Sequence, residues 1–240
     1  MIKNVPILIL CGGRGKRLGL ISKKIPKTLV KINNKPIINH KLDYYKKSGF
    51  NNFYLCIGYK GALIQKHLNK YRSKIQYSNS SQKAGILKRI YEASKKIEQD
   101  TMIISYGDTL AKINLKKLLA GHKNSKALIT IVVSQILNPF GIVKYNSKNK
   151  LTKFSEKPML NHFIGYAVFS KKMLNSVPKE IINRPDGDGI VKLLQSEFMK
   201  GKINIFKFNG LQLTINSFKD INEANIKYNK YFTLNENSKK

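Results

Sequence analysis

A glycine-rich, basic loop follows the first apolar run of the chain. Residues 6–11 are apolar, and residues 12–18 read GGRGKRL. Glycines in such a loop let the backbone approach a phosphate closely, so that its N–H groups can point at the phosphate oxygens. The loop is not a Walker A motif, because no Lys-Ser or Lys-Thr closes it, and its glycine spacing differs from the dinucleotide-binding fingerprint. Phosphate binding and a tight strand-to-helix turn both explain these residues taken alone.

Two further charged residues could act together with this loop. Lys27 follows Pro26, whose fixed φ holds the chain extended, so Lys27 can turn back over the loop beside Arg17. Asp108 follows a glycine at the end of an apolar run, where a carboxylate can hold a Mg²⁺ ion that bridges phosphates. A turn or helix-capping role is the other interpretation of this aspartate. The three charges predict a cationic clamp facing a magnesium site around one triphosphate-sized hollow.

The order of these motifs resembles the sugar nucleotidyltransferase family, whose signature is GGxGxRL followed by PK. The glucose-1-phosphate cytidylyltransferase branch is the most similar, and the resemblance runs from Ile7 to about Tyr228. The signature occupies residues 12–18 and 26–27, and the GYKG, YGD, FG and FxEKP segments of that branch occupy residues 58–61, 106–108, 140–141 and 154–158.

The resemblance implies a role for each part of the site. Arg17 and Lys27 would stabilise the α-phosphate and the departing pyrophosphate, and Asp108 would bind Mg²⁺ together with Asn216. The nucleotide would be bound by Leu10, Cys11, Gly12, Gly13, Arg14, Gly15, Gly85 and Gly107. The sugar phosphate would be bound by Gly141, Glu156, Lys157 and Gly165. On the residues alone, a surface ion pair is the favoured explanation of Glu156 and Lys157.

Three positions depart from the family pattern. Asn216 stands where the family has an aspartate as its second metal ligand, and a neutral amide oxygen would hold Mg²⁺ less tightly. Lys112 stands where an acidic residue is expected soon after the first ligand. Residues 83–86 read KAGI in place of TGGR, so the arginine of the base-recognising segment is missing. Asp220 is near Asn216 but matches a helix-capping aspartate of the family, so we interpret it as a cap and not as a metal ligand. These departures leave the base preference open.

The elements that must position these residues alternate in the first half of the chain. Continuous apolar strands alternating with amphipathic helices predict an α/β, Rossmann-like fold with a mostly parallel sheet between two helical layers. Such sheets bind ligands at the carboxyl ends of their strands. We expect strands over 6–11, 53–57, 75–78 and 102–106, and helices over 36–47, 62–69 and 87–97.

In the second half of the chain, strands follow one another without helices between most of them, which predicts a mixed sheet. Strand-like runs follow one another with short polar connections, including a hairpin around residues 146–149. We expect one domain over residues 1–232 and a frayed tail over 233–240. The expected strands are 129–134, 141–145, 151–154, 163–169, 203–208 and 211–215, and the expected helices are 190–199 and 222–232.

The composition is extremely basic, with 45 Lys and Arg against 13 Asp and Glu and a net charge of +32. This charge would attract any polyanion, but the lysines are scattered along the chain and form no basic stripe, so we do not expect nucleic-acid binding. No apolar run is long enough to span a bilayer. The apolar start leads into the glycine loop and not into a signal-peptide cleavage site, which predicts a cytoplasmic protein. Cys11 and Cys56 are interpreted as small buried hydrophobic residues.

The resemblance implies transfer of a nucleoside monophosphate from an NTP, CTP in the most similar branch, to a sugar 1-phosphate with release of pyrophosphate. The nucleophile is already an anionic phosphate oxygen, so no general base is needed and the scattered histidines are interpreted as structural. Two alternatives are kept. One is the same fold with another phosphorylated acceptor, such as phosphocholine, and the other is an NTP-binding regulatory module weakened by Asn216 and Lys112. Association into a homo-oligomer is left open.

Overall fold

Seven strands form the central sheet of the protein. The computed structural model describes residues 4–71 and 74–228. The strand order is β12-β8-β11-β6-β1-β4-β5, and β11 runs antiparallel to both of its neighbours while the other pairs are parallel. The mixed, mostly parallel sheet expected from the sequence is therefore confirmed. Its strands are β1 (Ile7–Leu10), β4 (Phe53–Ile57), β5 (Ile75–Asn79), β6 (Thr101–Tyr106), β8 (Ile129–Leu137), β11 (Met159–Ser170) and β12 (Ile203–Lys207).

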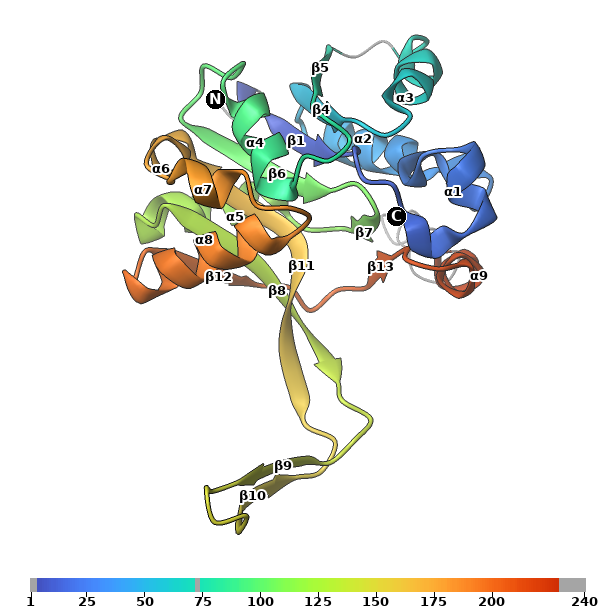
Figure 1. Ribbon diagram of the computed structural model, residues 1–240. Helices are drawn as coiled ribbons and strands as arrows, with labels where there is room; N and C mark the ends of the chain where they lie inside the picture. The colour runs from blue at the N-terminus through green and yellow to red at the C-terminus, as the bar shows by residue number, and fades with distance from the viewer. Residues whose placement is uncertain (1–3, 72–73, 229–240) are drawn as a thin grey trace, which may run out of the picture.

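Helices cover both faces of this sheet (Figure 1). Successive side chains of a strand point to opposite faces, so Ile7 and Ile9 of β1 join one apolar cluster and Leu8 joins another. The first face is covered by α2 (Ile37–Lys47), α3 (Gly61–Leu68) and α5 (Leu115–Ser125). The second is covered by α4 (Ile86–Ser94), α6 (Lys171–Asn175), α7 (Lys179–Ile182) and α8 (Asp188–Met199).

A third apolar cluster joins the turns after the glycine loop to the last helix. It contains Leu18, Val30, Leu213 and Ile221 among others. In this region β13 (Gln212–Thr214) pairs antiparallel with β7 (Thr109–Ala111), outside the main sheet. The cluster brings residues 18–37 and residues 211–228 together near the carboxyl end of β6. Its other elements are the short turns η2 (Lys16–Leu18) and η3 (Lys27–Leu29), α1 (Leu20–Lys24), β2 (Lys31–Ile32), β3 (Lys35–Pro36) and α9 (Phe218–Tyr228).

A long two-stranded arm, residues 136–160, projects from the sheet (Figure 1). It consists of the continuations of β8 and β11 and, at its end, the hairpin of β9 (Ile142–Tyr145) and β10 (Leu151–Ser155). The predicted hairpin around 146–149 is thus confirmed, whereas the sequence did not reveal that it leaves the body of the protein. The exposed large apolar side chains of the arm are Ile136, Leu137, Phe140, Ile142, Val143, Tyr145, Leu151, Phe154, Met159 and Leu160.

The last helix and α5 differ from the expectation, and the short helices α1, α6 and α7 were not expected either. The last helix begins at residue 218 and not at 222, because Ser217 and Asp220 form a capping box in which each accepts a backbone N–H bond from the other. The helix α5 was not predicted, although Asn114 caps it by accepting a bond from the Lys117 N–H. The predicted end of the last helix beyond residue 228 and the tail over 233–240 lie outside the described residues.

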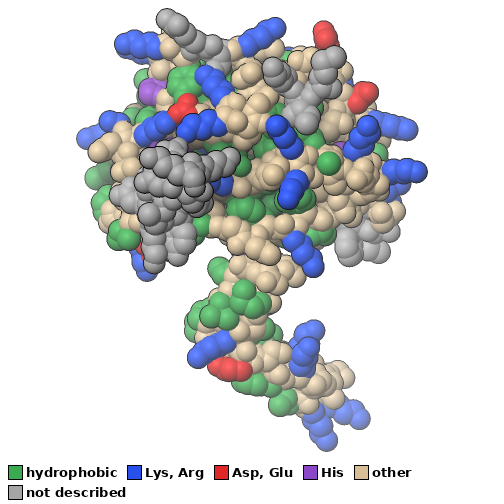
Figure 2. All heavy atoms as spheres, turned by 180° about the vertical axis from the view of Figure 1, so that it is seen from behind, with side chains coloured by type: hydrophobic (Ala, Val, Ile, Leu, Met, Phe, Trp, Pro, Cys, Tyr) green, Lys and Arg blue, Asp and Glu red, His purple; other side chains and the backbone are tan. Residues whose placement is uncertain are grey.

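The basic side chains are spread over the surface. Figure 2 shows Lys and Arg side chains distributed over the body and the arm on that face, without one continuous basic patch. This agrees with their scatter along the sequence. Among the described residues, no helix has the length and apolar character needed to cross a membrane.

Candidate active site

The glycine loop lies at the carboxyl end of β1, in the middle of the sheet. It is tied to the residues after β4, because the Cys11 N–H donates to the Cys56 carbonyl over 2.9 Å and the Tyr59 N–H donates to the Gly12 carbonyl over 3.1 Å. A Cβ atom at position 12 would come within 2.1 Å of Arg89 Nη1. Gly15 has a φ of 62°, in the left-handed region that favours glycine. The loop therefore needs glycine for both packing and conformation.

A cavity of about 600 Å³ opens at this loop, a size suited to a small-molecule ligand. The structure places Arg17, Lys27 and Asp108 in the wall of this single cavity. Most residues expected to contact the nucleotide line it as well, so the motifs identified along the sequence converge in space. The expected site residues in its wall are Leu10, Cys11, Gly12, Gly13, Arg14, Gly15, Arg17, Lys27, Gly107, Asp108 and Asn216.

Lys27 is held between two oxygen atoms from distant parts of the chain. Its Nζ donates to Asp108 Oδ2 over 2.6 Å and to Asn216 Oδ1 over 3.0 Å. Pro26 has an extended conformation (φ −68°, ψ 149°) and presents Lys27 at the start of η3. The side chains of Lys27 and Asp108 are only 13% and 25% exposed, so solvent screens their interaction less than that of a surface pair.

Backbone contacts fix the two oxygen ligands of Lys27. The Gly107 N–H donates to the Leu10 carbonyl over 3.1 Å, and the Asp108 carbonyl accepts the Ile215 N–H over 3.0 Å. Asp220 Oδ2 accepts the Asn216 N–H over 2.7 Å, which confirms its capping role. Its slight burial would raise the pKa of the Asp220 carboxyl, but the N–H bonds it accepts outweigh this and hold that pKa below its ordinary value.

Arg89 is a cavity residue that the sequence analysis missed. It is buried on α4, and its guanidinium donates to the carbonyls of Ile57 (3.1 Å), Ser81 (2.9 Å) and Ala84 (3.1 Å). It therefore fixes the loop before α4, whose KAGI segment lacks the family's arginine. The sequence signal that could have identified Arg89 is a cationic residue in the first turn of the expected helix, directly after the KAGI segment. The other lining residues that were not foreseen are Lys16, Thr28, Gln82, Lys83, Ala84, Ile86, Tyr106, Asp186 and Gly187.

Gly85 lies beside the cavity, where two backbone segments meet. A Cβ at this position would be 2.1 Å from the Arg184 carbonyl oxygen, and the next residue, Ile86, donates its N–H to the Asp186 carbonyl over 2.7 Å. This close approach brings the segment before α8 against the start of α4. The glycine is therefore explained by packing, while its neighbours form the cavity wall.

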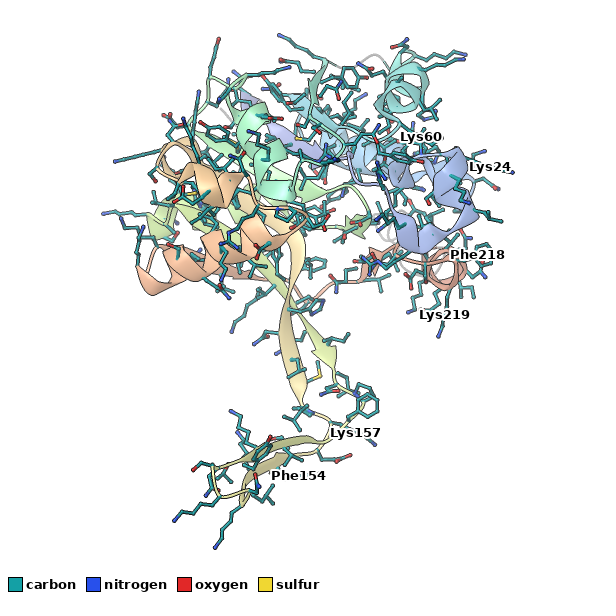
Figure 3. All side chains as sticks on the ribbon, viewed as in Figure 1. Lys24, Lys60, Phe154, Lys157, Phe218 and Lys219 are labelled. Carbon is teal, nitrogen blue, oxygen red and sulfur yellow. The ribbon has the colours of Figure 1, made fainter. Side chains whose placement is uncertain are left out.

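The structure does not bring the expected sugar-phosphate residues together with this cavity. Gly141, Glu156 and Lys157 lie on the arm, and Figure 3 shows Lys157 far from the body of the protein. Lys157 Nζ is 3.7 Å from Glu156 Oε1, and both side chains are about 60% exposed. Gly165 lies within the sheet, where a Cβ would be 2.6 Å from Cγ of Tyr106, a lining residue. Only Gly165 is thus near the cavity wall of the same chain.

Comparisons with known proteins identify the family of the chain. The model of the family described as "Nucleotidyl transferase" matches residues 7–201. The chain belongs to this family. It is similar to a "Probable glucose-1-phosphate cytidylyltransferase" of Bacillus subtilis, with 28% identity over 92% of this chain and 95% of that protein. It is also similar to a D-glycero-alpha-D-manno-heptose 1-phosphate guanylyltransferase of Aneurinibacillus thermoaerophilus, with 33% identity over 52% of this chain and 56% of that protein.

The fold of this nucleotidyltransferase is also found in solved structures. The structure of HddC from Yersinia pseudotuberculosis complexed with GMP-PN superposes with a TM-score of 0.70. The match covers 93% of this chain and 99% of that chain at 21% identity, a level at which the likeness concerns the fold alone. The expected α/β nucleotidyltransferase architecture is confirmed.

The oxygen atoms around Lys27 suit a divalent cation. The carboxylate of Asp108 and the amide oxygen of Asn216 are hard donors of the kind that such cations prefer. Within residues 4–71 and 74–228, no group of three or more His, Cys, Asp or Glu side chains could hold a metal alone. A cation in this nucleotidyltransferase would therefore take its remaining ligands from substrate phosphates and water. Lys112, the unexpected base near Asp108, lines a different cavity of about 750 Å³.

The cysteines and histidines do not form a nucleophile in this enzyme. Cys11 and Cys56 are buried free thiols, and burial raises the pKa of Cys11 to about 12, so this thiol stays protonated although it lines the cavity. Burial lowers the pKa of His40 and His122. None of the described histidines lines the cavity. This fits a reaction in which the attacking phosphate oxygen is already anionic.

Proposed function

We propose that the enzyme transfers a nucleoside monophosphate from an NTP to a sugar 1-phosphate and releases pyrophosphate. The observation that carries this proposal is the convergence of Arg17, Lys27 and Asp108 on one cavity beside the glycine loop. Family membership supports the reaction type, and sugar 1-phosphates are the substrates that the names of the similar proteins contain.

In the proposed reaction, a phosphate oxygen of the acceptor attacks the α-phosphorus of the NTP. One P–O bond forms to the acceptor, and the bond from the α-phosphorus to the bridging oxygen breaks, so that pyrophosphate carries away the electron pair. Two unit charges about 4 Å apart at an effective dielectric constant near 20 repel by roughly 4 kcal/mol. Arg17 and Lys27 would offset this repulsion, and the N–H groups of the loop would orient the phosphates.

We propose Mg²⁺ as the cation held by Asp108 and Asn216. When bound, it would neutralise phosphate charge and hold the triphosphate in one orientation. Lys27 now shares both oxygen atoms, at 2.6 and 3.0 Å. Its ammonium would turn toward the phosphates when those oxygens bind a cation.

We further propose CTP as the nucleotide donor. The support is the similarity to the Bacillus subtilis protein, which extends over most of both chains. The base would lie between the loop residues 82–84 and the segment 186–187, which line the end of the cavity next to α4. Turnover with each of the four NTPs tests this, and a clear preference for GTP, UTP or ATP would replace CTP in the proposal.

The acceptor site is proposed to be completed by the arm of a second copy. Glu156 and Lys157 lie on an arm that carries many exposed apolar side chains, an unusual surface for a monomer. Packing this arm across another copy would cover those side chains and carry the Glu-Lys pair toward a neighbouring cavity. We therefore propose a homo-oligomer in which each acceptor site uses two chains.

A panel of acceptors tests the proposed function. The enzyme is incubated with each NTP, Mg²⁺ and a set of sugar 1-phosphates, with phosphocholine as the non-sugar control, and pyrophosphate release is measured. We expect release with one or a few sugar 1-phosphates and none with phosphocholine. Release with phosphocholine alone would change the acceptor class. Tight NTP binding without release from any acceptor would favour the regulatory module instead.

A further inference from the structure

Lys41 is a buried lysine that the proposed reaction does not use. It lies on α2 and is only 2% exposed, although burying an ammonium group away from water is costly. Among the described residues no carboxylate forms an ion pair with it. A charge in this position must therefore be stabilised by other groups, and those groups indicate what it does.

The ammonium of Lys41 is bonded to the residue that follows the metal-site aspartate. Its Nζ donates to the Thr109 carbonyl over 2.5 Å and to the Tyr166 hydroxyl over 2.7 Å. The Tyr166 hydroxyl donates in turn to the same Thr109 carbonyl over 2.9 Å. The Lys41 Nζ also lies 4.6 Å from the centre of the Tyr166 ring, a distance at which a cation is attracted to an aromatic face. Two donors thus hold one peptide group.

That carbonyl belongs to the Thr109–Leu110 peptide, which is separated from the Asp108–Thr109 peptide only by the Cα atom of Thr109. The Thr109 hydroxyl lies 3.3 Å from Asp108 Oδ1 and donates to it, and the Asp108 carbonyl is fixed by the Ile215 N–H. Lys41 and Tyr166 therefore hold this turn from the side of the second cavity, which both of them line, while the Asp108 carboxylate faces the first. A rotation of the Thr109 peptide would move the carboxylate relative to Lys27.

We propose that Lys41 is a positioning residue for the Asp108 carboxylate, with Tyr166 as its partner. It fixes the Thr109 peptide so that the carboxylate keeps the orientation in which a divalent cation can bind. The inference rests on the proposed function only in assigning the cation to Asp108. Groups that orient metal ligands typically change metal affinity by about 10- to 100-fold when they are removed, and this sets the size of the expected effect.

The test compares Lys41→Met with a matched control on the same helix. Met preserves the length and packing of the side chain but cannot donate to Thr109. The control is Lys46→Met, whose ammonium lies 4.3 Å from the Tyr71 ring and does not contact the turn. Each protein is titrated with Mn²⁺ in the presence of a non-hydrolysable CTP analogue, and the free Mn²⁺ is measured by electron paramagnetic resonance. We expect the Mn²⁺ dissociation constant to rise about 10-fold in Lys41→Met and to stay unchanged in Lys46→Met.

A second variant keeps the test decisive if Lys41→Met does not fold. Tyr166→Phe removes only the hydroxyl and should weaken Mn²⁺ binding by a smaller factor. Turnover provides a further readout, since a higher metal requirement with an unchanged KM for the acceptor distinguishes positioning from general damage. Wild-type Mn²⁺ affinity in a folded Lys41→Met or Tyr166→Phe variant would overturn the proposal. Failure of the proposed function would appear differently, as absence of turnover in the wild-type enzyme itself.

Discussion

At the scale of single residues, substitution can test the catalytic role proposed for Arg17 and Lys27, two of the cationic residues that line the cavity. Both would offset phosphate repulsion in the proposed transition state, and neither is part of an apolar cluster. We expect Arg17→Ala and Lys27→Met to lower kcat by about 10²- to 10³-fold, the range seen when a charge-stabilising group is removed. Pyrophosphate release under saturating substrates measures the effect.

The control for this prediction is Lys24→Met, which removes a nearby lysine that is exposed on α1 and lies outside the cavity (Figure 3). It should retain wild-type turnover. The thermal midpoint should change little in Arg17→Ala and Lys24→Met, whose side chains are exposed. Lys27→Met also removes the partly buried partner of Asp108, so its folding is checked by its circular dichroism spectrum. Near wild-type turnover in both cavity variants would rule out the cationic clamp.

Asn216 offers a residue-scale test in the opposite direction. Its amide oxygen is 3.0 Å from Lys27 Nζ, beside Asp108, so Asn216→Asp would place a second carboxylate there. Metal affinity rises with the number of charged ligands. We expect the Mg²⁺ concentration for half-maximal turnover to fall by roughly 3- to 10-fold. A higher Mg²⁺ requirement would mean that the added charge mainly strengthens the bond to Lys27.

The sequence predicted the local motifs of the site better than its long-range contacts. The loop, Lys27 and Asp108 were found because each stands next to a glycine or proline with a clear conformational effect. The bond between Lys27 and Asn216 joins positions 189 residues apart and depends on the third apolar cluster. Arg89 was missed because its role depends on hydrogen bonds to three backbone carbonyl groups, which come close to it only in the folded chain.

At the scale of elements, the arm is separable from the core. Its exposed apolar side chains belong to none of the three buried clusters, and the Asn138 N–H bond to the Pro158 carbonyl (3.0 Å) closes its base. We expect a chain in which residues 139–157 are replaced by a short glycine turn to keep its circular dichroism spectrum and cooperative unfolding. Its turnover should be lost because Glu156 and Lys157 are gone. Full turnover would show that the arm has no part in the acceptor site.

The helices α2 and α5 each carry a buried histidine that makes stability depend on pH. Burial lowers the pKa of His40 and His122 below the ordinary value, so the unfolded chain binds protons first as the pH falls. Their contribution to stability is therefore present above the unfolded pKa of about 6.5 and is lost as the pH falls below it. The free energy of unfolding in urea should be lower at pH 5.5 than at pH 7.5.

Replacing one of these histidines measures its contribution to the pH dependence of stability. His122→Asn removes the titrating ring and leaves a group that can still bond to the Thr130 hydroxyl, which now lies 2.8 Å from His122 Nδ1. The variant should show a smaller difference in unfolding free energy between the two pH values. Asp43 and Asp220 have lowered pKa values, so their protonation changes stability only in more acidic solution than the two pH values compared. An unchanged pH difference would assign the effect to other groups.

The direction of the arm shows why predicting the strands was not enough to predict where Glu156 and Lys157 lie. Alternating strand patterns and the turn at 146–149 indicate that β9 and β10 pair, and they do. They carry no information on whether that hairpin folds back on the sheet or projects from it. The projection follows from the length of β8 and β11, whose pairing continues to Leu137 and Met159, well beyond the predicted strand ends at 134 and 163.

At the scale of the whole molecule, the separation of the two proposed halves of the site is the feature to explain. The cationic half lies in the body, and the Glu-Lys pair lies on the arm between β10 and β11, where the terminal hairpin begins (Figure 3). Within one chain, the two halves could meet only if the paired strands of the arm bent sharply. In the proposed homo-oligomer they would meet between two chains without such a bend, and the apolar side chains of the arm would become covered.

Mixing two inactive variants distinguishes these arrangements. Lys27→Met has an intact arm and a defective cavity, whereas Lys157→Met has an intact cavity and a defective arm. If arms are exchanged, each mixed dimer contains one site in which both halves are intact. Equal amounts reassembled at random should then recover on the order of a quarter of wild-type turnover, because half of the dimers are mixed and each has one active site of two.

The same mixture recovers nothing if each arm serves its own cavity, since every site then keeps one defect. Co-expression of the two variants with different tags and purification of the mixed species would raise the expected recovery to about half of the wild-type value per dimer. A mixture of Lys27→Met with Arg17→Ala is the matched control, because both defects lie in the cavity half and no pairing restores it. Recovery in the first mixture but not in the control would therefore locate the two halves of one site on two chains.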